Sequence, residues 1–115
     1  MSLKNIMIDI DGTICEDIPN ERDDLFLTAK LEPNAVESVN KLYELSGNII
    51  TIFTARKEEH REDTTKWLNY NGFKYHNLLM NKPRGGNYVW IDNLDVIGVK
   101  YDENKNNWNN ILKNM

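Results

Sequence analysis

The 115-residue chain has little cysteine, little proline and no long apolar run. Cys15 is its only cysteine, which excludes an intrachain disulfide and a CxxC metal site. No apolar stretch approaches the roughly 18 residues of a membrane span. Residues 1–5 also lack the apolar segment of a signal peptide. We therefore expect a cytoplasmic protein with no membrane partner.

The composition is that of one ordinary globular domain. Hydrophobic residues make up 40% of the chain and charged residues 28%, and the formal net charge is −4. The length allows a single core, so we expect one domain over residues 1–115. The acidic balance argues against non-specific binding of nucleic acid, which usually needs a basic face.

The first apolar run, over residues 4–10, ends in two acids. Asp9 and Asp11 stand two apart, so on a strand both carboxylates project to the same side. Two carboxylates this close repel each other unless a proton, a cation or hydrogen-bond donors compensate them. Gly12 and Thr13 follow with a turn whose backbone N–H groups suit an anion. A cation and an anion beside two carboxylates indicate phosphate chemistry.

Two simpler interpretations of this motif are a calcium-binding loop and a hairpin turn. A calcium-binding EF-hand loop needs an acid at its first position and a glutamate at its twelfth. Aligning Gly12 with the glycine of that loop places Met7 first and Ile18 twelfth, which excludes an EF-hand. A hairpin turn with incidental acids is compatible with the motif alone.

The remaining chain alternates between strand and helix patterns, which predicts an α/β fold with a parallel sheet. An acidic, weakly patterned flap is expected over residues 14–32, and it is too short for a cap domain. Further elements are expected as helices over 32–48 and 58–73, strands over 48–56, 75–80 and 87–92, and a C-terminal helix within 102–115.

Polar residues follow the predicted strands at the end where α/β sheets bind ligands. After Asp9 and Asp11, these are Thr54, Lys82 and Asp92. Singly, Thr54 fits a helix N-cap, Lys82 a solvated loop and Asp92 a turn. Together the five residues supply a nucleophile, a proton donor, a cation and a hydroxyl donor, which fits phosphoryl transfer through a covalent intermediate.

The five-residue run from Asp9 to Thr13, then Thr54, Lys82 and Asp92, resembles the four ordered motifs of the haloacid dehalogenase (HAD) superfamily. The resemblance implies a HAD-like, three-layer Rossmann-like parallel sheet flanked by helices, here without a separate cap domain. It implies Asp9 as nucleophile, Asp11 as general acid and then base, and Thr54 and Lys82 as holders of the phosphoryl oxygens. It also implies Mg²⁺ bound by Asp9, the backbone carbonyl of Asp11, and Asp92.

One departure from the family pattern is Asn93, where many members have a second acid. Its neutral side chain is expected to weaken Mg²⁺ binding without abolishing activity. Asp11 and Thr13 favour the phosphatase members over the dehalogenases. Receiver domains also combine acids, a threonine and a lysine around Mg²⁺. Their phosphorylated aspartate lies on a later strand, whereas residues 48–56 contain no acid.

The expected substrate is a sugar phosphate or a similar small metabolite, with Gly12, Thr13, Arg56 and Arg84 as substrate-binding residues. Small phosphatases of capsule and polysaccharide pathways resemble this chain, as do polynucleotide 3′-phosphatase domains, so a polynucleotide 3′-phosphatase or nucleotidase is the alternative. Five acids in residues 15–24 count against a polyanion. A non-catalytic phosphate- or Mg²⁺-binding module and phosphotransfer to another acceptor remain open.

A homo-oligomer that completes the site in place of a cap is a further hypothesis. The two histidines, His60 and His76, show no spacing that would make a catalytic triad with Cys15. All three are interpreted as packing or surface residues.

Overall fold

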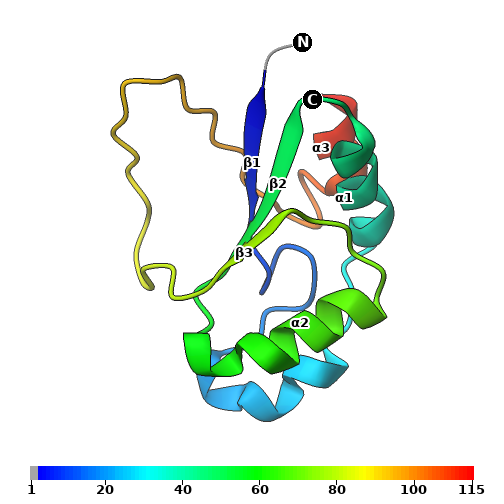
Figure 1. The fold of residues 1–115 in the computed structure, drawn as a ribbon, viewed down its shortest axis with the longest axis vertical. Coiled ribbons are helices and arrows are strands. Elements are labelled where there is room, and N and C mark those ends of the chain that lie inside the picture. The colour runs from blue at the N-terminus through cyan, green and yellow to red at the C-terminus, as the bar shows by residue number, and fades with distance from the viewer. Residues whose placement is uncertain (1–2) are drawn as a thin grey trace.

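The computed structural model describes residues 3–115 and contains one parallel sheet. Strand β1 (Lys4–Ile8) pairs with β2 (Asn48–Phe53), and β2 pairs with β3 (Asn77–Leu79), in the order β1-β2-β3 (Figure 1). Ile8 lies opposite Ile52 in the register, and Phe53 lies opposite Leu79. The predicted α/β fold with a parallel sheet flanked by helices is confirmed.

Three α-helices and two 3₁₀ segments accompany the sheet within residues 3–115. They are α1 (Ala35–Glu44), α2 (Arg61–Tyr70), α3 (Trp108–Lys113), η1 (Asn20–Thr28) and η2 (Glu58–His60). Helix α1 packs against β2 and α3 on one side of the sheet, and α2 packs against η1 below its end in Figure 1. Over residues 3–115, no helix has the length and apolar character needed to cross a membrane.

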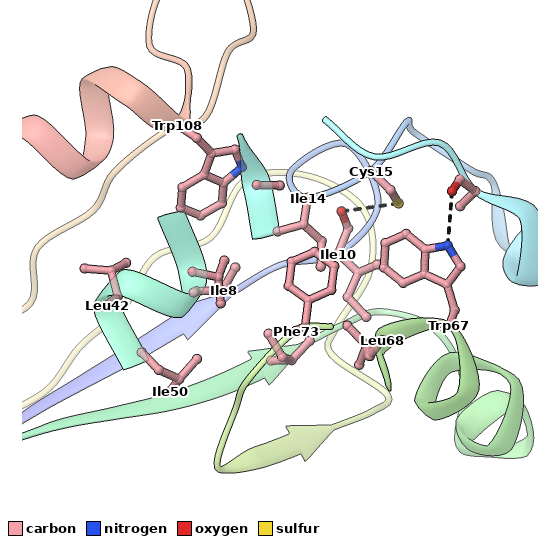
Figure 2. Packing of buried hydrophobic residues seen from close by; sticks show 14 of the residues in the cluster. Ile8, Ile10, Ile14, Cys15, Leu42, Ile50, Trp67, Leu68, Phe73 and Trp108 are labelled. Atoms are coloured by element: carbon pink, nitrogen blue, oxygen red, sulfur yellow. Dashed lines mark hydrogen bonds between the residues drawn. The ribbon is translucent and has the colours of Figure 1, made fainter. Parts of the chain in front are cut away.

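The core gathers the apolar side chains of the strands and the facing helices (Figure 2). Ile50 and Ile52 of β2 are fully buried, as is Leu68 of α2. Trp67 is 2% exposed, and its indole Nε1 donates to the carbonyl of Ala29 at 3.0 Å. This bond joins α2 to the end of the segment that contains η1.

The acidic segment 14–32 follows the two acids, and its two ends lie next to each other. Its two ends are held together by an antiparallel bridge between Cys15 and Leu31 and by the bond from Glu16 N to the carbonyl of Lys30 at 2.8 Å. Phe26 of η1 is fully buried and anchors the middle of the segment to the core. The remaining side chains of η1 are mostly exposed.

The predicted strand over 87–92 is wrong, because this stretch forms no strand in the structure. Residues 81–100 instead form a long connection after β3 that extends away from β1 (Figure 1). Val89 is 85% exposed and Ile91 is 92% exposed. Strand preference reflects packing on neighbouring strands rather than the local sequence alone, and this segment has no such neighbour. Within the described residues, β1 pairs only with β2 and its other edge stays open.

We predict that Trp67→Phe lowers the free energy of unfolding by about 1–3 kcal/mol, since the Ala29 carbonyl loses a buried donor. Urea unfolding measures the change. Tyr70→Phe, at a side chain that is 89% exposed on the same helix, is the control and is expected to change stability little. Equal effects of the two substitutions would contradict the proposed role of the indole bond.

Candidate active site

The two acids of the first motif lie just beyond the end of β1. Asp9 directly follows the strand, and Ile10 between the acids is fully buried. The carbonyl of Ile10 accepts from Thr13 N at 3.0 Å and from Ile14 N at 2.9 Å. Gly12 sits in the left-handed region at φ 81°, where a side chain would be strained. This turn fixes the position of both carboxylates relative to the core.

The backbone N–H groups of this turn are used within it, which corrects the expectation that they are free for an anion. Gly12 N donates to the carbonyl of Cys15 at 3.0 Å, and Thr13 N donates to Ile10. The left-handed Gly12 closes the loop on itself and turns these donors inward. The N–H groups of Gly12 and Thr13 are therefore not available to a ligand.

Asp9 has a cation and a hydroxyl beside its two oxygens. Lys82 Nζ lies 3.5 Å from Asp9 Oδ1, and Thr13 Oγ1 donates to Asp9 Oδ2 at 3.2 Å. Burial raises the pKa of Asp9 above its ordinary value, while Lys82 and the hydrogen bonds from Ile10 and Thr13 act in the opposite direction. The Asp9 side chain is 35% exposed, so its carboxylate is accessible to a ligand.

Asp11 has a different cation. Arg56 Nε donates to Asp11 Oδ2 at 3.0 Å, and Arg56 Nη2 donates to Asp11 Oδ1 at 2.8 Å. Arg56 Nη1 donates to Thr64 Oγ1 at 3.2 Å, and the guanidinium lies 3.9 Å from the ring centre of Phe26. The Arg56 side chain is fully buried, whereas that of Asp11 is 14% exposed.

The buried position of Arg56 differs from the substrate-binding role expected from the sequence. Its guanidinium is enclosed by Asp11, Thr64 and Phe26 and does not reach the surface. Arg84 is exposed in the segment after β3, and its nearest acid is Glu21 of η1 at 3.8 Å. Sequence reasoning missed the Asp11–Arg56 pair, because the two residues stand 45 positions apart in the chain.

Thr54 and Lys82 come together through the ends of β2 and β3. Thr54 N donates to the carbonyl of Leu79 at 3.0 Å, and Lys82 N donates to the carbonyl of Thr54 at 2.9 Å. Thr54 is fully buried, and its Oγ1 accepts from Arg56 N at 3.1 Å. A hydroxyl that accepts one bond still has its own proton to donate. Asp9, Lys82 and Thr54 are thus linked by direct contacts, and Asp11 joins them through Arg56.

The fifth residue, Asp92, lies apart from the other four. It is in the exposed connection, where it accepts from Leu94 N at 3.0 Å and from Trp90 Nε1 at 3.2 Å. These bonds lower the pKa of Asp92. No group of three or more His, Cys, Asp or Glu side chains suited to a metal occurs in residues 3–115. The separation follows from the missing strand over 87–92.

The two histidines occupy packing positions, as interpreted from the sequence. His76 Nδ1 accepts from Ile50 N at 2.9 Å, and its ring stacks on Tyr43 with ring centres 4.5 Å apart. His60 packs edge-on against Phe26 with ring centres 5.3 Å apart. Neither contact places a histidine beside Cys15.

Comparison with solved structures supports the fold. A crystal structure of an MCSG target from Vibrio cholerae has a TM-score of 0.58 and 21% identity, and the match covers 78% of this chain and 80% of that one. Similarity at this identity shows the fold alone.

Two further matches come from assemblies. A chain in the Pnkp1/Rnl/Hen1 complex matches with a TM-score of 0.56 and 22% identity, covering 69% of this chain and 28% of that one. A chain in the Pnkp1/Rnl/Hen1 RNA repair complex matches with a TM-score of 0.58 and 22% identity, covering 68% of this chain and 26% of that one. No protein-family model matches the chain, and no curated protein does.

We predict that Cys15 does not react with a disulfide reagent such as DTNB in the folded protein at pH 8. Its side chain is fully buried, and burial together with Asp11 raises its pKa far above the ordinary thiol value, so the reactive thiolate is not formed. Rapid reaction in urea and none in buffer is the expected result. Rapid labelling of the folded protein would contradict the buried placement of Cys15.

Proposed function

We propose that the protein is a phosphomonoester hydrolase that works through an aspartyl-phosphate intermediate. One observation carries the proposal. Two carboxylates lie at the end of a parallel strand, and each has its own cation, Lys82 for Asp9 and Arg56 for Asp11. This arrangement gives two neighbouring carboxylates different surroundings, which is what a nucleophile and a proton carrier require.

In the first step, an oxygen of Asp9 attacks phosphorus and the bond from phosphorus to the ester oxygen breaks. Asp11 in its protonated form gives its proton to the departing oxygen. Lys82 Nζ already lies beside Asp9, and we assign it and the Thr54 hydroxyl to the charge and orientation of the phosphoryl oxygens. The products are the free alcohol and phosphorylated Asp9.

In the second step, Asp11, now a carboxylate, takes a proton from water as the water oxygen attacks phosphorus. The bond between Asp9 and phosphorus breaks, inorganic phosphate leaves, and both acids return to their starting states. Thr13 holds Asp9 Oδ2 through its hydroxyl, which fixes the carboxylate for attack and for release. The proton that Asp11 gives up in the first step is thus recovered from water in the second.

Mg²⁺ is the proposed cofactor, and the donor types fit it. Mg²⁺ prefers oxygen ligands and keeps several waters, so the carboxylate of Asp9, the carbonyl of Asp11 and the carboxylate of Asp92 are sufficient protein ligands. When bound, the ion would neutralise charge on the phosphoryl oxygens. The proposal requires residues 87–92 to fold against the open edge of β1, because Asp92 is remote from Asp9 in the exposed connection.

A sugar phosphate or another small ester is the preferred substrate. The 14–32 segment contacts Arg56 through Phe26 and carries Glu16, Asp17, Glu21, Asp23 and Asp24, which would repel a polyanion. A polynucleotide 3′-phosphatase activity is the second candidate, and it is favoured by the structural likeness to a chain in an RNA repair complex.

We predict that Asp9→Asn lowers the rate of phosphate release by at least about 10³-fold, because the amide is not a nucleophile. The assay measures phosphate from a panel of sugar phosphates, nucleotides and a 3′-phosphorylated oligonucleotide, with Mg²⁺ and with chelator. Asp24→Asn, at an exposed carboxylate of η1, is the control and should retain the activity. Absence of turnover by the wild type with Mg²⁺ bound would favour the non-catalytic binding module.

We predict that Asp92→Asn weakens Mg²⁺ binding by about tenfold or more, as expected for loss of a carboxylate ligand. Calorimetric titration measures the affinity, and Asp95→Asn in the same connection is the matched control. Mg²⁺ should also slow hydrogen exchange of the backbone amides in 87–92, a stretch of exposed residues. Unchanged affinity and unchanged exchange would exclude Asp92 as a ligand.

A further inference from the structure

We propose that Arg56 is the positioning residue for the proton carrier Asp11, and that it acts on proton transfer rather than on substrate binding. This inference rests on the proposed function. Arg56 was expected to contact substrate, yet its side chain is fully buried and its donors face protein groups. Asp11 is the partly exposed partner of this buried guanidinium, so we expect the effect of Arg56 on the reaction to pass through Asp11.

The contact between the two side chains fixes the plane of the carboxylate. Arg56 donates through Nε to one oxygen and through Nη2 to the other, at 3.0 Å and 2.8 Å. A carboxylate has about four acceptor positions, so this two-bond contact leaves positions on Asp11 for a proton. A lysine at position 56 would offer a point charge and could not hold both oxygens in a plane.

Arg56 is itself held on three sides. Its backbone N–H donates to Thr54 Oγ1 at 3.1 Å, and its Nη1 donates to Thr64 Oγ1 at 3.2 Å. The ring of Phe26 covers the guanidinium at 3.9 Å. These contacts join the end of β2, helix α2 and the 14–32 segment at one guanidinium. The orientation of Asp11 is therefore set by packing that does not involve the substrate.

Esters with different leaving groups can show whether Arg56 positions the acid Asp11 or only supports the structure. A strongly basic alkoxide needs a proton as it departs, whereas dinitrophenolate departs without one. Loss of Asp11 alignment should slow attack on an alkyl phosphate and leave attack on 2,4-dinitrophenyl phosphate nearly unchanged. The relevant parameter is kcat/KM, because it reports the steps up to formation of phosphorylated Asp9.

The test compares Arg56→Lys with the wild type on both esters, after circular dichroism and thermal unfolding show that the variant is folded. We expect kcat/KM for the alkyl phosphate to fall by about 100-fold, as small misplacements of catalytic groups do, and that for the dinitrophenyl ester to fall by less than about threefold. KM for the alkyl phosphate should change little. Arg22→Lys is the matched control, since Arg22 makes the same two-bond contact with Asp24 at an exposed site.

Thr64→Val provides the test if Arg56→Lys does not fold. It removes the bond to Arg56 Nη1 and keeps the Asp11–Arg56 pair, so a loss of about fivefold is expected with the alkyl ester alone. A loss that is equal for both leaving groups, or a change confined to KM, would overturn the inference and leave the proposed function standing. If the wild type turned over neither ester, both the inference and the proposed function would be overturned.

Discussion

The structure depends on the compensation of two carboxylates just beyond the end of β1. Asp9 and Asp11 stand on either side of a fully buried isoleucine, so neither can move away from the other without disturbing the core. Each charge is balanced by a separate cation from a later part of the chain, Lys82 in one case and Arg56 in the other. The parallel pairing of β1 with β2 and of β2 with β3 brings the ends of the three strands together, and so brings both cations to the two acids.

The surroundings of the acids are held by two tryptophans at opposite sides of the site. Trp108 of α3 donates from Nε1 to the carbonyl of Thr13 at 2.8 Å, which ties the end of the chain to the turn after Asp11. Trp67 of α2 donates to Ala29 and so fixes the end of the 14–32 segment. Both indoles are buried in the core. The core thus contributes to the site by fixing the backbone on which the carboxylates stand.

Local patterns were sufficient to predict much of the fold. The apolar runs of β1 and β2 and the amphipathic face of α1 are recognisable in short windows of sequence, and the structure contains all three. The run 87–92 has the same strand-like composition as β1, yet it lies exposed. A strand requires a partner as well as a pattern, and the sequence does not state whether the open edge of β1 is filled.

The sequence allowed most residues of the candidate site to be predicted, but not the contacts between them. Asp9, Asp11, Thr54 and Lys82 could be selected because each follows an apolar run. The partner of each acid could not be selected in the same way. Arg56 and Asp11, for example, are distant in sequence and meet only after the sheet forms. Arg56 and Arg84 both follow strands, yet one is buried and the other exposed, because only Arg56 has Phe26 and Thr64 around it.

The most direct test of the central claim is to find the residue that carries the phosphoryl group during turnover. The protein would be mixed with an activated phosphate ester and Mg²⁺, quenched in acid within milliseconds, digested and mapped by mass spectrometry. The account predicts phosphate on the peptide that contains Asp9, attached to that residue and absent from Asp9→Asn. Phosphate on another residue, or steady turnover with no phosphorylated protein, would contradict it.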